Sequence, residues 1–247
     1  MKRMNIFFTM VFSLFVLGVQ AKKPLIVGSG VVKIENRDVT SFSRLIVSDA
    51  IDLKLTKSAT EGVRIEAEDN ILPLVVVESG GDKLSIRLKD THSISTKLSV
   101  RVYVSYKQLS EIFVSGASKL SATEPLDDNK ILLILSGASH ANLDVKTQWL
   151  SINCSEASKA VINGDTKKLN VQCSGASSVD AQKLSALEAD ADASGASQIT
   201  LIGTEQLNIT ASGASVVRYL NYAGTSVTKN VSGASTVVPL DAPGTSE

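Results

Sequence analysis

The stretch LNVQCSGASSVDAQ, residues 169–182, contains the four-letter word SGAS, and this word decides the fold. Six copies read SGAS, and a seventh reads SEAS with Glu156 in place of glycine. Successive copies are separated by 18 to 21 residues. Such regular spacing indicates a repeat architecture. The first serines of the seven words are Ser115, Ser136, Ser155, Ser174, Ser194, Ser212 and Ser232.

Apolar residues alternate with polar ones on both sides of each word. The residue before the word is Val, Leu, Cys or Ala, and the third residue before it is apolar in every copy except the last, which has Lys229. The second and fourth residues after the word are also apolar. A period of two is that of a strand with one buried face. Each repeat therefore predicts a strand, an SGAS bend, a second strand and a turn.

A unit of this length cannot bury its own apolar face, so neighbouring units must stack. Every unit carries the same word in the same order, which favours parallel coils over hairpins. The sequence predicts an all-β protein, a right-handed parallel β-helix of about seven SGAS-marked coils over residues 111–240, with the hand taken from the bias of parallel crossovers. Aromatic residues make up only 4% of the chain, so Val, Ile, Leu and Ala must fill the core.

The word itself suits a tight corner where coils press together, because glycine permits backbone angles that other residues resist. Its serine hydroxyls can bond neighbouring backbone groups or one another. A binding strip or a row of nucleophiles is the alternative, but only the second word has a histidine beside it, His140 after Ser139. Glu156 is interpreted as a tolerated corner residue, with a role in a site as the alternative. The predicted corner glycines are Gly116, Gly137, Gly175, Gly195, Gly213 and Gly233.

The region 35–110 lacks the word but has strand composition. Residues 42–55 align with the later repeats and predict a diverged coil. The 67 residues from Ser48 to Ser115 equal about three coils in length, and their irregularity indicates a β cap for the open end of the solenoid. We also expect these N-terminal strands to cover Leu132 and Ile134, two apolar residues at outward positions.

The outward positions of the later coils form a polar array that could hydrogen-bond a glycan or a protein partner. An ordinary solvated face is the alternative. Calcium is disfavoured because the Gly-Gly-x-Gly-x-Asp repeats that bind it are missing. The candidate binding residues are Asn153, Asn170, Gln172, Asp190, Asp192, Asn208 and Thr210.

The first 21 residues have a basic start, an apolar run of about 14 residues and a small-x-small end, the pattern of a cleaved signal peptide. The remainder divides into a linker (22–34), the two β regions (35–110 and 111–240) and a tail (241–247). Cleavage removes Lys2 and Arg3, which leaves 23 basic against 25 acidic residues. This balance gives no reason to expect a nucleic-acid partner. The expected location is periplasmic, outer-membrane-associated or extracellular, with no transmembrane segment after cleavage.

Residues that could carry chemistry are few. Cys154 and Cys173 share a column, so they are either a disulfide or, as we favour, two buried thiols. His92 and His140 lack companions at metal-ligand spacing. We therefore predict no metal, no cofactor and no catalytic residue. A carbohydrate-active β-helix enzyme, the alternative, would need acids converging in a groove.

Several segments together resemble the auto-transporter adhesin head GIN domain family of secreted Bacteroidetes proteins. They are RDVTSF (37–42), LIVSDAIDLKL (45–55), VRIEAEDNIL (63–72), GGDKLSIRL (80–88) and the SGAS coils. The resemblance spans about residues 35–240 and implies a β-helix-like fold and an adhesive role, with no catalytic residues to carry over. A C-terminal membrane barrel, which an auto-transporter needs, is not expected in this chain.

The sequence favours an exported, non-enzymatic binding or adhesion module whose partner is a glycan or a cell-surface or envelope protein. A structural protein of the cell envelope ranks second, and an enzyme third. The ligand, the oligomeric state and the mode of surface attachment stay open.

Overall fold

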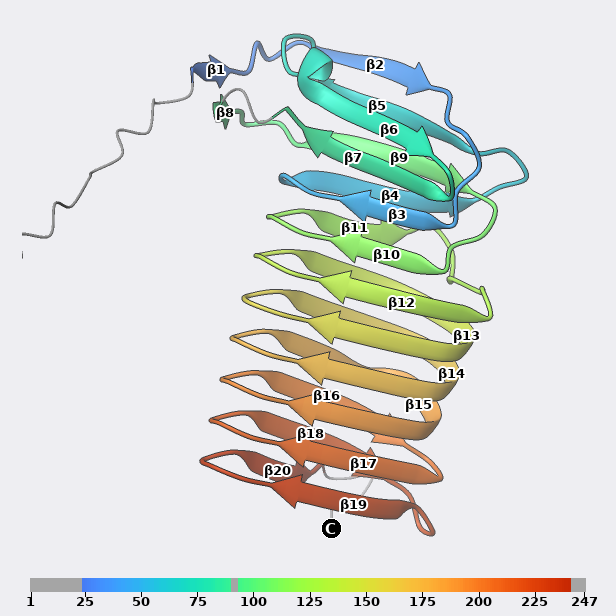
Figure 1. Cartoon of the computed structure of the whole chain (residues 1–247), viewed down its shortest axis with the longest axis vertical. Helices are drawn as coiled ribbons and strands as arrows, with labels where there is room; N and C mark the ends of the chain where they lie inside the picture. The colour runs from blue at the N-terminus through green and yellow to red at the C-terminus, as the bar shows by residue number, and fades with distance from the viewer. Residues whose placement is uncertain (1–23, 90–92, 241–247) are drawn as a thin grey trace, which may run out of the picture.

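The computed structural model describes residues 24–89 and 93–240. The predicted signal peptide, the tail, the first two linker residues and His92 lie outside the described residues. The fold is the predicted all-β, right-handed parallel solenoid, with about six turns stacked along one axis (Figure 1).

Each flattened coil contributes one strand to each of two facing sheets. We call them the pre-SGAS sheet and the post-SGAS sheet, after the side of the word on which their strands lie. The pre-SGAS sheet contains β10 (Glu111–Val114), β12 (Lys130–Leu135), β17 (Gln206–Ala211) and β19 (Ser226–Val231). The post-SGAS sheet contains β11 (Lys119–Ala122), β16 (Gln198–Gly203), β18 (Val216–Asn221) and β20 (Thr236–Pro239). Three long strands bend and run through both sheets: β13 (His140–Cys154), β14 (Lys159–Cys173) and β15 (Ser178–Ala193).

Equivalent residues of successive coils pair in parallel register, so the sequence columns become physical columns. Ile112 pairs with Leu133, and Ile152 with Val171, with side chains buried between the sheets. Burial of such aliphatic side chains supplies the main stabilising free energy, roughly 1.5–3 kcal/mol each. Lys229 ends this column in the last coil, where its amine lies 4.6 Å from the centre of the Tyr219 ring.

The SGAS words lie at one corner of each coil, and the hydrogen-bond ladder continues through them. From the second word on, the alanine amide donates to the carbonyl of the glycine position in the word before, as from Ala196 to Gly175 at 2.8 Å. The second serine turns inward: Ser177 is 1% exposed, and its hydroxyl donates to the carbonyls of Cys154 and Ser174. All six corner glycines have φ between +68° and +72°.

The first two strands of the N-terminal half form the predicted diverged coil. β3 (Arg44–Val47) pairs directly with β10, and β4 (Ile51–Lys57) with β11. The residues between Ser48 and Ser115 therefore do not lie between these two coils. Instead β7 (Lys83–Leu88) pairs with β3, and β9 (Val100–Tyr106) with β4, on the far side of the diverged coil.

Antiparallel strands extend both sheets at the N-terminal end, at the top of Figure 1. β6 (Val75–Gly80) pairs with β7, while β5 (Gly62–Glu68) lies between β9 and β2 (Val32–Arg37). A 3-10 turn (Leu72–Leu74) leads into β6, and β1 (Leu25–Val27) pairs with β8 (Ser93–Ser95) apart from the main sheets.

The expectation that N-terminal strands cover Leu132 and Ile134 is wrong. Those strands continue the stack in the plane of the sheet, so β10 and then β3 follow β12 edge to edge and do not lie over its outer face (Figure 1). Both residues are half-buried by their column neighbours alone, for example Phe113 beside Ile134. An aliphatic patch thus stays open on the pre-SGAS face at the N-terminal side of the polar array.

Candidate functional site

The structure brings the seven predicted binding residues together on the outer face of the pre-SGAS sheet. Parallel pairing places them in two adjacent columns, because positions two and four before each word point to the same side. One column contains Asn153, Gln172, Asp192 and Thr210, and the other contains Asn170, Asp190 and Asn208.

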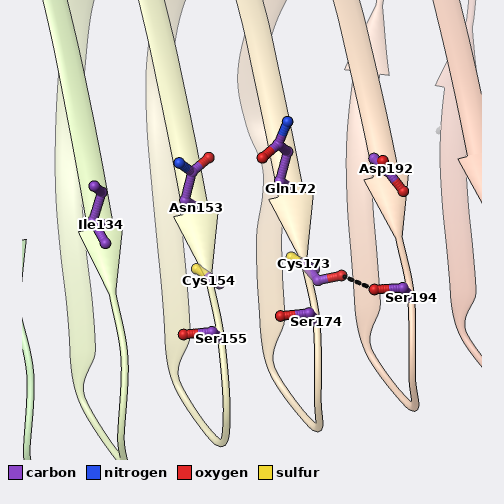
Figure 2. Close-up of a pocket in the computed structure, with 9 residues that line it drawn as sticks. All are labelled: Ile134, Asn153, Cys154, Ser155, Gln172, Cys173, Ser174, Asp192 and Ser194. Carbon is purple, nitrogen blue, oxygen red and sulfur yellow. Dashed lines mark hydrogen bonds between the residues drawn. The ribbon is translucent and has the colours of Figure 1, made fainter.

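A cavity of about 290 Å³ lies where the first column meets the corner. Its lining includes the side chains of Ile134, Asn153, Gln172 and Asp192, which lie side by side on successive coils, from left to right in Figure 2. The first serines of three words close its other side: Ser155, Ser174 and Ser194. The Ser194 hydroxyl donates to the Cys173 carbonyl of the neighbouring coil at 3.3 Å.

Asn153 has the most informative environment in this cavity. Its Oδ1 atom is enclosed and accepts no hydrogen bond from the residues that the structure describes. Leaving a buried acceptor unpaired costs about 1–3 kcal/mol. Because the atom is shielded from solvent, a ligand donor could pair with it only after the Asn153 side chain turns outward. The Gln172 amide and the Asp192 carboxylate of the same cavity are exposed and directly accessible.

The other predicted residues lie outside the cavity lining. Asn208 donates from Nδ2 to Oδ1 of Asp190 at 2.7 Å, a cross-strand pair that orders the second column. Farther along the same strands, Lys168 and Glu188 form an ion pair at 2.7 Å. The hydrogen bond with Glu188 raises the pKa of Lys168. This part of the face is therefore internally paired, whereas the cavity retains free hydrogen-bonding capacity.

Sequence reasoning does not single out Ile134 or the first serines as lining residues. It places Ile134 on a covered surface, although the position of this residue in the Asn153 column already puts the two side by side. It interprets the first serines as structural. The alignment of residues in columns is the sequence signal that could have identified both Ile134 and the first serines as lining residues.

Cys154 and Cys173 also contribute to the cavity lining, and both are free, buried thiols, the state that the sequence favours. Their hydrogen bond, together with burial, raises the pKa of the Cys173 thiol. No cluster of three or more His, Cys, Asp or Glu side chains suited to a metal ion occurs within residues 24–89 and 93–240. In the same described part of the chain, no helix has the length and apolar character needed to cross a membrane.

The observed coils and columns define the class of this protein: a parallel β-solenoid that displays polar ladders on a flat outer face. The particular family follows from its sequence. Residues 41–223 match the model of the family described as "Putative auto-transporter adhesin, head GIN domain", and the chain belongs to this family. The resemblance found in the sequence is thus confirmed.

Solved structures share the fold at low sequence identity. One described as "a putative adhesin" from Bacteroides fragilis has a TM-score of 0.80 and 16% identity, and covers 87% of this chain and 100% of its own. Another described as "a putative adhesin", from Parabacteroides merdae, has a TM-score of 0.69 and 19% identity, covering 88% and 100%. A "putative lipid binding protein" from Parabacteroides distasonis has a TM-score of 0.71 and 16% identity, and covers 88% of this chain and 100% of its own. The search of curated proteins gave no match.

Proposed function

We propose that this chain is an exported, non-enzymatic adhesion module whose pre-SGAS face binds a glycan or a cell-surface protein. The observation that carries the proposal is the cavity in which the exposed Gln172 amide and Asp192 carboxylate lie beside Asn153, whose Oδ1 has no hydrogen-bond partner among the described residues. Amide, carboxylate and hydroxyl groups repeated on successive rungs suit a ligand that is itself polar and extended. Membership of the adhesin family supports the same role.

The binding test compares the wild-type chain with Asn153→Ala/Gln172→Ala on a glycan array and on whole cells. Both substitutions remove amide groups from the cavity lining. Asn230→Ala is the matched control, because Asn230 occupies the same column in the last coil and is exposed. We expect the double variant to lose the bound ligand and the control to keep it. Equal binding by all three proteins, or no ligand for the wild type, would contradict the proposal.

Two further measurements address the rest of the proposal. Incubation with a polysaccharide panel should release no new reducing ends and no unsaturated products, since the module binds without chemistry. Protease shaving of intact cells should remove the protein if it is displayed at the surface, and a periplasmic protein would survive the treatment.

A further inference from the structure

The post-SGAS face carries a row of basic side chains that the proposed function does not use. Lys119 of β11 pairs in register with His140 of β13, which pairs with Lys159 of β14. All three side chains are exposed. We call this row the basic strip; with rungs about 4.8 Å apart, its two lysines are separated by about 10 Å.

Among the described residues, one acidic side chain shares the row of the basic strip: that of Asp52 on β4, in register with Lys119. Some lysines elsewhere form ion pairs, such as Lys57 with Asp127 and Lys168 with Glu188. Within residues 24–89 and 93–240, no ion pair joins Lys119 or Lys159 to an acidic group. In a nearly neutral protein, an unpaired basic row therefore indicates a surface suited to an anion.

A cavity of about 430 Å³ follows the basic strip. Besides the three basic residues, its lining includes Ser121 and Asn142, the next outward positions on the same strands. The Ser121 hydroxyl and the Asn142 amide thus lie two residues along their strands from Lys119 and His140. Asp52 of β4 pairs with Lys119 and lines one end of the cavity, where its carboxylate would repel an anion.

We infer that the basic strip binds an anionic glycan along the solenoid axis. Its carboxylate or sulfate groups pair with Lys119 and Lys159, and its hydroxyls bond Ser121 and Asn142. A nucleic acid is disfavoured because, among the described residues, no Phe, Tyr or Trp side chain lines the cavity for base stacking. The basic strip and the proposed adhesion cavity lie on opposite sheets, so an experiment can disprove one proposal without affecting the other.

The test measures binding of the full chain to three hexasaccharides by calorimetry: a heparin fragment with sulfates, hexagalacturonate with carboxylates, and neutral cellohexaose. We expect at least one anionic probe to bind with an affinity that falls as salt rises. The neutral probe should not bind. The two anionic probes distinguish a sulfated from a uronic-acid ligand, and either result supports the inference.

Variants assign the binding to the basic strip. Lys119→Gln/Lys159→Gln should weaken the bound anionic probe about tenfold, since two exposed charge pairs are lost. Lys119→Arg/Lys159→Arg should restore binding. The matched control Lys146→Gln/Lys167→Gln makes the same change of net charge at exposed positions of β13 and β14.

Three outcomes would overturn the inference. They are equal weakening in the matched control, no binding of either anionic hexasaccharide, and tighter binding of an oligodeoxynucleotide of equal charge. Circular dichroism spectra identical to wild type would show that the glutamine variants keep their fold, which is expected because both lysines are exposed.

Discussion

Alanine substitutions at three glycines distinguish two contributions to the free energy of unfolding. One is the strain of a left-handed backbone, and the other is the contact of an added Cβ with the neighbouring coil. Gly175 has φ +69°, and a Cβ there would lie 2.8 Å from the carbonyl oxygen of Glu156 in the preceding coil. Gly224 also has positive φ, +94°, but nothing lies within 4 Å of an added Cβ. Gly62 has neither feature.

The expected magnitudes follow from these geometries. A left-handed backbone costs an L-residue with a side chain about 1–2 kcal/mol, so Gly224→Ala should destabilise by that amount. Gly175→Ala should cost about 1–3 kcal/mol more than Gly224→Ala, because its Cβ must also displace the backbone of the neighbouring coil. Gly62→Ala should be neutral or slightly stabilising, because alanine loses less conformational entropy on folding.

Urea unfolding followed by far-ultraviolet circular dichroism gives the order of stability. Hydrogen exchange adds a local measurement at the Ala176 amide, which donates to the Glu156 carbonyl at 2.6 Å across the same corner. In Gly175→Ala this amide should exchange faster, while amides of β4 keep their protection. The reciprocal change, Glu156→Gly, removes a side chain from φ +61° and should stabilise by about 1 kcal/mol.

One result would refute the stacked-corner reasoning. If Gly175→Ala and Gly224→Ala lower the urea midpoint equally, the backbone of the neighbouring coil does not press on the corner. The word would then be retained for its backbone angle alone.

Three other substitutions or modifications have expected outcomes. Ser177→Ala should cost about 1–2 kcal/mol in urea unfolding, because its buried hydroxyl donates to two carbonyls, whereas Ser174→Ala at an exposed position should be nearly neutral; equal effects would contradict this. Cys154 and Cys173, 2% and 3% exposed, should resist alkylation by iodoacetamide until urea unfolds the chain, and fast labelling of native protein would contradict their burial. Lys229→Leu removes a charge from the last coil and should promote concentration-dependent association in sedimentation velocity; a variant that stays as monomeric as wild type would contradict the protective role of this lysine.

The repeat region can be predicted from the sequence because each of its units specifies the same local structure. The spacing of the words and the alternation around them predict the parallel coils, the inward columns and the corner. In-register pairing then follows, since a shift of one residue would turn every buried side chain outward. This is why the sequence alone suffices to place Asn153, Gln172 and Asp192 in one column.

The N-terminal half cannot be predicted in the same detail. Its strands lack the word, and nothing local indicates that β3 and β4 stack on coils 67 residues later while β7 and β9 occupy their other side. The column register places Ile134 beside Asn153, but whether the N-terminal strands leave Ile134 uncovered depends on this tertiary arrangement.

The sequence by itself determined the repeating coil, because the period of two and the small corner residues act within a single turn of chain. The tertiary structure alone decided where cavities open and which polar atoms find partners. The unpaired Oδ1 of Asn153 and the row from Lys119 to Lys159 without ion pairs, both among the described residues, are of this kind. Both depend on contacts between coils and on the positions of side chains across a face. The packing energies of the whole fold set these contacts and positions, and no local sequence pattern encodes them.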